Sequence, residues 1–175
     1  WDTIYEGLST LPEPARTSWF AFDHFYSNNS FEEALKVIFD RPVRNLLDVG
    51  GNTGKWALQC VGHDPDVEVT ILDLPQQIGL MKEETAGKPG AERIHGGNLL
   101  DPATKFPSDK EYDVIWMSQF LDCFSEDEIL GILTRAAEVL RPGARLCIME
   151  LLWNRQRFEP AAFCLTMTSL YFTAM

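Results

Sequence analysis

Basic charge is scarce in this chain. Its 175 residues hold 15 Lys and Arg against 26 Asp and Glu, which gives a formal net charge of −11. A surface of this sign repels a phosphate backbone, and no basic run interrupts it, so nucleic acid is excluded as a general partner. No apolar stretch approaches the roughly 18–20 residues of a membrane span, so we expect no membrane association.

Cysteine and histidine motifs are also missing. Cys60, Cys123, Cys147 and Cys164 form no C-x-x-C pair, and the three histidines share no metal-ligand spacing. We therefore expect no metal site. Cys147 and Cys164 lie in apolar runs, which predicts core thiols in a reducing compartment and hence a cytoplasmic protein.

The amino terminus lacks the features of a signal peptide. Trp1-Asp2-Thr3 begins neither a basic region nor an apolar one, and there is no initiator Met. We therefore expect the sequence to be part of a longer chain.

From residue 45 onward, strand-like and helix-like segments alternate. The predicted strands are the largely apolar runs at 45–49, 67–73, 112–117 and 146–149, with a weaker strand at 92–95 before Gly96-Gly97. This alternation predicts an α/β fold with a doubly wound, mostly parallel sheet. Because the run at 146–149 is continuously apolar, we expect that strand to be covered on both faces.

Helices are predicted at both ends of the chain and between the strands. The clearest follows a capping box at Ser125 and continues to Leu140, where Arg141-Pro142-Gly143 ends it. A second capping box at Ser30 predicts a helix through Phe39 within an aromatic-rich segment. A last amphipathic helix is predicted at about 159–174.

A glycine-rich turn follows the first predicted strand. In Gly50-Gly51-Asn52-Thr53-Gly54 the small residues let a ligand approach the backbone, and the next helix presents free N–H groups. Asp73 ends the second strand, 19 residues after Gly54, where a carboxylate can accept hydrogen bonds from ribose hydroxyls. The plainer interpretations are a tight turn for the loop and a solvated acid for Asp73. The combination of the loop with Asp73 favours a nucleoside site.

The glycine spacing discriminates between nucleosides. A dinucleotide fingerprint that starts at Gly50 needs glycines where Asn52 and Lys55 stand, and a phosphate-binding G-x-x-x-x-G-K-[ST] motif is absent. A nicotinamide-dependent oxidoreductase is therefore disfavoured. Adenosine with an amino-acid tail fits the loop better, because it carries no phosphates.

Four segments together resemble class I S-adenosylmethionine-dependent methyltransferases, especially the small-molecule O-methyltransferases of the caffeate and hydroxyindole type. The segment 47–54 is similar to their first glycine motif, with Asn52 at the middle glycine, and Leu72-Asp73-Leu74-Pro75 to their second-strand motif. Gly96-Gly97-Asn98-Leu99 resembles their G-G-D-M/F segment, and 140–143 a turn common among them.

The resemblance implies a Rossmann-like sheet of order 3-2-1-4-5, S-adenosylmethionine as cofactor and a small-molecule acceptor. It also divides the chain into an N-terminal helical linker or lid (1–44) and a cofactor-binding core (45–175). The implied cofactor contacts are Asp48, Gly50 and Gly54 for the methionine part, Asp73 for the ribose, Asn98 and Leu99 for the adenine, and Gly51, Asn52, Leu74, Met117 and Ser118 around them.

The acceptor side departs from the family pattern. The family's catalytic histidine belongs where this chain has Asp122, and a carboxyl with the usual pKa near 3.9 is a poor base for a phenol unless burial raises it. Asp122 is the candidate catalytic residue for a more acidic or already nucleophilic acceptor, such as an amine or an enolic carbon. The alternatives are a cofactor-binding module without turnover, and a local cap near the next helix.

The resemblance also assigns acceptor contacts to aromatic and apolar residues. Phe25, Tyr26, Phe163 and Met167 fall where the family's acceptor-contacting helices lie, which implies an apolar, aromatic acceptor. Core packing is the plainer interpretation for each of them. The family's N-terminal dimerisation domain and C-terminal strand pair have no counterpart in this sequence, so we expect a longer protein that forms a homodimer.

Overall fold

A computed structural model describes residues 7, 10–90 and 92–174; at 20–26 and 168–174 it describes the backbone alone. The strands are β1 (Asn45–Val49), β2 (Glu68–Asp73), β3 (Arg93–Gly96), β4 (Tyr112–Ser118) and β5 (Leu140–Met149). The helices are α2 (Glu13–Asn28), α3 (Phe31–Ile38), α4 (Lys55–His63), α5 (Pro75–Thr85), α6 (Glu126–Ala137) and α7 (Glu159–Ala174), with short 3-10 turns η2 (Leu121–Cys123) and η3 (Trp153–Arg155).

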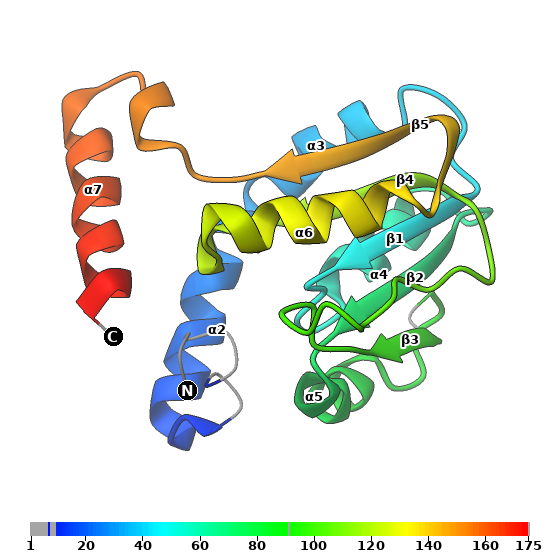
Figure 1. Cartoon of the computed structure of the whole chain (residues 1–175), viewed down its shortest axis with the longest axis horizontal. Coiled ribbons are helices and arrows are strands. Elements are labelled where there is room, and N and C mark those ends of the chain that lie inside the picture. The colour runs from blue at the N-terminus through cyan, green and yellow to red at the C-terminus, as the bar shows by residue number, and fades with distance from the viewer. Residues whose placement is uncertain (1–6, 8–9, 91, 175) are drawn as a thin grey trace.

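The strands form one parallel sheet in the order β3-β2-β1-β4-β5, which confirms the expected topology. The five predicted strand positions are confirmed as well, and α5 begins at Pro75, where a missing N–H is harmless. Figure 1 shows the strands pointing toward the side of the molecule on which α2 and α7 lie. No helix among the described residues has the length and apolar character needed to cross a bilayer.

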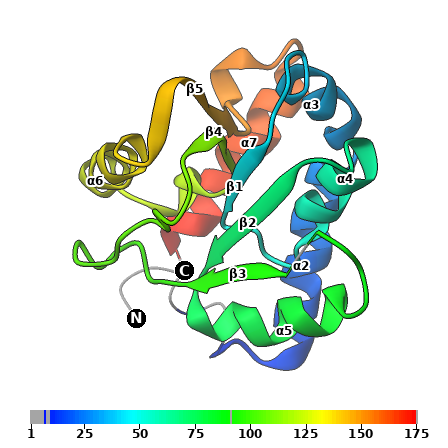
Figure 2. The ribbon, with the colours of Figure 1, turned by 90° about the vertical axis from the view of Figure 1, so that its right-hand side faces the viewer.

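Strand alternation divides the core into two layers. Leu46 faces α3, α4 and α5, where Trp56 packs between Phe31 and Trp116 with ring centroids 5.1 and 4.5 Å apart. Leu47 faces the other side, where Ile132 of α6 is fully buried. In Figure 2 the sheet runs between α6 on one side and α3 with α4 on the other. The two layers make the doubly wound architecture.

Several predictions for the carboxyl half of the chain are wrong. Helix α6 ends at Ala137 rather than Leu140, because the backbone from Leu140 pairs with Tyr112 and extends β5 through Arg141-Pro142-Gly143. The face of α6 that is fully buried carries Ile132 and Ala136. The expectation that β5 is covered on both faces is wrong, since β5 is the last strand of the sheet and Ile148 is 46% exposed.

Two further expectations fail for local reasons. Ser30 has helical backbone angles and makes no side-chain capping bond, so α3 starts without the predicted capping box. Cys164 is exposed on α7 and is not a core thiol, whereas Cys60 is buried and Cys147 is partly buried. The capping box at Ser125 is confirmed, with Ser125 and Glu128 exchanging hydrogen bonds at the start of α6.

Candidate functional site at the carboxyl edge of the sheet

The loops that follow β1, β2, β3, β4 and β5 all leave the same edge of the sheet. The last residue of β1, Val49, pairs with Leu72 on β2 and Met117 on β4, so three strand ends stand side by side. In open parallel sheets the crevice outside this edge is where ligands bind. The sequence-predicted cofactor residues are thereby brought together at one place.

The glycine loop turns sharply above β1. Gly50 and Gly54 have φ of +72° and +76°, and Asn52 also lies in the left-handed region with φ of +52°. The amide of Gly54 donates to the carbonyl of Gly51 at 2.8 Å. A Cβ on Gly50 would stand 2.5 Å from the ring of Phe120, and one on Gly51 would stand 2.4 Å from Ile71. Glycine is needed here because neighbouring side chains already occupy that space.

Asp73 ties the end of β2 to this loop. One carboxylate oxygen accepts the N–H of Asn52 at 2.7 Å, and the other accepts the N–H of Leu74 at 2.7 Å. Asp73 is 5% exposed and Leu74 is 1% exposed. Both oxygens of this buried carboxylate thus hold backbone donors at the carboxyl edge of the sheet.

Asp48 is the most unusual residue of the site. It is 2% exposed, and its Oδ2 has no hydrogen-bond partner within the described part of the chain. Burial raises the pKa of this carboxyl to about 8, and the charge of Asp73 adds to the effect. Oδ2 therefore lacks the compensation that a buried carboxylate needs, which a cationic group of a ligand would supply.

A small cavity lies beneath the loop. It measures about 30 Å³ and is lined by residues that include Asp48, Trp56 and Ser118. Trp56 Nε1 and Ser118 Oγ are also buried without a hydrogen-bond partner among the described residues. Three polar groups thus border one hole of about the size of a water molecule.

The loop after β3 brings Asn98 and Leu99 to the same edge. The N–H of Gly97 donates to the carbonyl of Asp73 at 2.9 Å, which joins this loop to β2. Asn98 Oδ1 accepts the N–H of Leu100 at 3.0 Å, so the side chain shapes its own loop. Leu99 is 2% exposed and Met117 is fully buried, and both pack in the core layer that also holds Ile132 of α6.

Asp122 lies in η2, directly after β4. The residue is exposed, but the surrounding protein atoms desolvate its carboxyl and raise the pKa above its usual value. Cys123 Sγ lies 3.7 Å from Oδ1 as a weak donor. The N-cap of α6 is Ser125, so Asp122 does not cap that helix, although it does accept this local hydrogen bond near the helix start.

Glu150 is a site residue that the sequence analysis missed. Its Oε1 accepts the N–H groups of Phe120 at 3.0 Å and Leu121 at 2.9 Å, while Oε2 is buried without a partner in the described chain. Burial, with a smaller contribution from the nearby charge of Asp122, raises the pKa of Glu150 to about 7. Its position directly after an apolar strand could have indicated a site residue, because Asp73 was found from the same kind of position at the end of β2.

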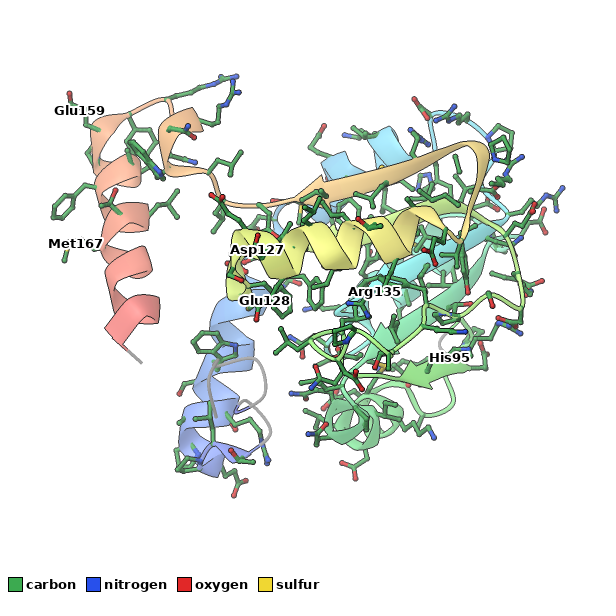
Figure 3. All side chains as sticks on the ribbon, in the orientation of Figure 1. His95, Asp127, Glu128, Arg135, Glu159 and Met167 are labelled. Carbon is green, nitrogen blue, oxygen red and sulfur yellow. The ribbon has the colours of Figure 1, made fainter. Side chains whose placement is uncertain are left out.

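The predicted acceptor residues are not brought together at this edge by described side chains. Phe163 and Met167 are 66% and 47% exposed on α7, and Figure 3 shows Met167 pointing away from the sheet. Phe25 and Tyr26 belong to α2, but their side chains lie outside the described residues. The acceptor contacts therefore stay a prediction.

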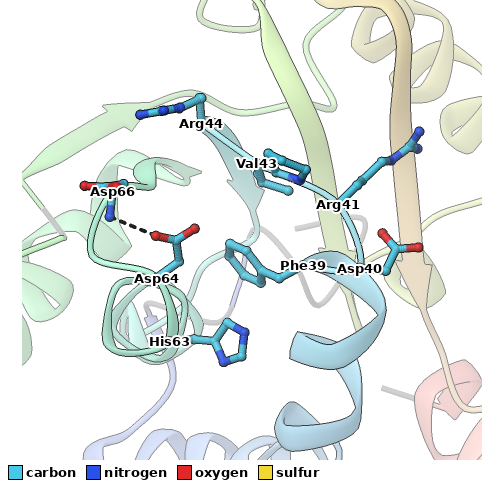
Figure 4. Close-up of a pocket in the computed structure, with 9 residues that line it drawn as sticks. Phe39, Asp40, Arg41, Val43, Arg44, His63, Asp64 and Asp66 are labelled. Atoms are coloured by element: carbon cyan, nitrogen blue, oxygen red, sulfur yellow. Dashed lines mark hydrogen bonds between the residues drawn. The ribbon is translucent and has the colours of Figure 1, made fainter.

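A larger hollow lies at the opposite end of β1. It measures about 500 Å³ and is lined by residues that include Phe39, Arg44, His63 and Asp64 (Figure 4). Its floor is a packed pair, Phe39 and His63, with ring centroids 5.0 Å apart. Because it adjoins the amino ends of the strands, it is not in the usual ligand position of a parallel sheet.

Comparisons with known proteins agree with this geometry. The model of the O-methyltransferase domain family matches residues 27–175. Norreticuline-7-O-methyltransferase of Papaver somniferum is 28% identical over 141 residues, which cover 80% of this chain and 36% of that protein. Bacteriochlorophyllide d C-20 methyltransferase of Chlorobaculum tepidum is 25% identical over 151 residues, which cover 84% and 44%.

Solved structures show the same fold. The apo form of the S-adenosylmethionine-dependent methyltransferase SibL superposes with a TM-score of 0.72 at 23% identity, covering 94% of this chain and 48% of that one. The chain spans less than half the length of these relatives. Since the family model covers most of its residues, the chain belongs to the O-methyltransferase domain family.

Proposed function

We propose that this chain binds S-adenosylmethionine at the carboxyl edge of its sheet and transfers the methyl group to a small organic acceptor. The observation that carries the proposal is the unpartnered, buried Oδ2 of Asp48 beneath a loop that only small residues can form. The ammonium group of an amino acid supplies the positive charge and donors that this oxygen lacks. The family membership of the chain supports the same ligand.

The described residues fit the rest of the cofactor. Asp73 places a carboxylate beside the loop, where ribose hydroxyls can donate to it, and Leu99 offers an apolar side chain to the adenine. Gly50, Gly51 and Gly54 leave the backbone accessible. When bound, S-adenosylmethionine supplies an electrophilic methyl group on its sulfonium sulfur.

Two carboxyls are available for the acceptor's proton. Asp122 is exposed beside the loop after β4, and Glu150 fixes that loop through Phe120 and Leu121. Asp122 would take the acceptor's proton while the methyl–acceptor bond forms, the methyl–sulfur bond breaks and S-adenosylhomocysteine leaves, and its raised pKa would make it a better base than an ordinary aspartate. An amine or an activated carbon suits such a base better than an unactivated phenol.

A second candidate function is cofactor binding without turnover. The carboxyl at position 122, where the resemblance places a histidine, favours it. Methylation at nitrogen or carbon is a third, and the similarity to a C-20 methyltransferase supports it. Turnover assays with phenols, amines and enolic carbon acids separate the three, since a pure binder methylates none of them.

Calorimetric titration with S-adenosylhomocysteine tests the binding step directly. We expect binding by the wild type, weaker binding by Asp48→Asn and Asp73→Asn, and no response to NADH. Asp113→Asn is the matched control, because Asp113 is also a buried aspartate but lies at the start of β4, at the far edge. A folded wild type that does not bind S-adenosylhomocysteine contradicts the proposal.

A further inference from the structure

Arg135 makes an unusual set of hydrogen bonds from α6. Its Nη1 donates to the carbonyls of Asp101 at 3.0 Å and Thr104 at 2.7 Å, and its Nη2 donates to the carbonyl of Leu99. Its Nε donates to Gly131 within the same helix at 3.2 Å. No carboxylate pairs with Arg135 within the described chain, so its guanidinium serves backbone carbonyls alone.

All three loop carbonyls belong to the segment that follows β3. Figure 3 places Arg135 on the side of α6 that faces this segment. The guanidinium is planar and presents its donors in a fixed fork, so one side chain sets the relative positions of three peptide groups. Lysine, with a single ammonium on a flexible stem, can donate to some of these carbonyls but fixes their relative positions less well.

The helix that carries Arg135 cannot rotate to follow the loop. Ile132 and Ala136, on either side of Arg135 in the sequence, are fully buried in the layer that also holds Leu99 and Phe106. Arg135 therefore joins a fixed helix to a segment that has no regular secondary structure. The position of the Leu99 backbone depends on this link.

We propose that Arg135 is the positioning residue for adenine recognition, acting through the backbone of residues 98–104 without touching the ligand. The inference rests on the proposed function, which assigns Asn98 and Leu99 to the adenine. Asn98 also depends on the loop, because its Oδ1 accepts the Leu100 N–H. A shift of this segment would move Asn98 and Leu99 relative to the adenine. It would leave the residues assigned to the methionine part of the ligand unchanged.

The test compares two ligands that differ only at the purine. S-adenosylhomocysteine carries the adenine amino group, and S-inosylhomocysteine carries a carbonyl oxygen in its place. We expect wild type to prefer the first, and Arg135→Ala to lose about tenfold of that preference, which is the value of one discriminating hydrogen bond. Arg135→Lys should restore part of it.

Arg145→Ala is the matched control. Arg145 also donates to two backbone carbonyls, those of Val37 at 3.0 Å and Ile38 at 2.6 Å, but these lie at the end of α3. We expect this variant to be less stable and to keep the wild-type preference between the two ligands. Equal loss of preference in both variants means general destabilisation and overturns the inference.

Hydrogen exchange supplies a readout without ligand. In Arg135→Ala the amides of residues 98–104 should exchange faster, and those of the glycine loop should not change. Unchanged exchange at 98–104, or an unchanged ligand preference, overturns the role of Arg135. A wild type that binds neither ligand refutes the proposed function itself, and the wild-type titration alone identifies that outcome.

Discussion

The carboxylate of Asp73 accepts the N–H of Asn52 at 2.7 Å, so the end of β2 and the glycine loop after β1 form one unit. Asn52 has a positive φ, which is uncommon for a residue with a side chain. The hydrogen bond helps to hold that conformation. Asp73 thus shapes the glycine loop.

Replacement of Asp73 tests its role in holding the loop. In Asp73→Asn an NH2 group replaces one carboxylate oxygen and faces a backbone N–H, so two donors meet and one hydrogen bond is lost. The free energy of unfolding should fall by about 1–3 kcal/mol. Urea denaturation measures it. Asp66→Asn is the control, because Asp66 is exposed on the turn before β2. If both substitutions cost the same, the Asp73 bonds do not hold the loop.

The pKa of Asp48 makes stability depend on pH in a specific direction. It lies at about 8 in the folded protein, above the usual 3.8, so between these values the native state binds more protons than the unfolded state. The contribution of Asp48 therefore falls as pH rises through this window, by up to about 1.4 kcal/mol per pH unit.

Asp48→Asn removes this proton and keeps the shape of the side chain. We expect its free energy of unfolding to fall less between pH 5 and pH 8 than that of wild type. Chemical denaturation at several pH values measures the two slopes. The rest of the acidic surface acts equally on both proteins, so parallel slopes would show that Asp48 does not carry a raised pKa.

Glycine 50 cannot be replaced without loss. Gly50→Ala places a Cβ 2.5 Å from Phe120 at a φ of +72°, so we expect a destabilisation of at least about 1–2 kcal/mol. Gly62→Ala is the control, because nothing lies within 4 Å of its added Cβ inside α4, and it should stabilise by about 0.5–1 kcal/mol. Thermal unfolding should show a lower Tm for Gly50→Ala and a higher Tm for Gly62→Ala. Equal shifts in the two variants would contradict the tight packing at Gly50.

Glu150 should control the pH dependence of turnover. With a pKa of about 7, raised by burial and then by Asp122, it ionises within the neutral range. Glu150→Gln removes the group that ionises near neutral pH, so the change in rate that accompanies this ionisation should be lost from the pH profile. Glu126→Gln, in the exposed first turn of α6, should leave the profile unchanged. A change in rate near pH 7 that persists in Glu150→Gln contradicts the assignment.

The strands and their order follow from local patterns, whereas several side-chain roles do not. Apolar runs placed β1, β2 and β4 correctly because buried parallel strands need largely apolar residues. The alternation of strands with helices placed β3, which is polar and only partly buried. Leu140 fits the period of α6, yet pairing with Tyr112 places it in β5, a tertiary effect that no local pattern contains. Arg135 has no signal in the sequence, since its partners lie 31 to 36 residues away.

The irregular pairing between β4 and β5 has a consequence for the opposite edge of the sheet. Between Tyr112 and Val114, β4 advances two residues while β5 advances from Leu140 to Arg145, and the extra length carries Arg141 to the carboxylate of Asp113. The same carboxylate accepts the N–H groups of Arg44 and Asn45 where β1 begins. One aspartate thus fastens three chain segments at the end of the molecule where no chemistry is proposed. Binding energy at the other end can then be used to reorganise loops without loosening the strands that support them.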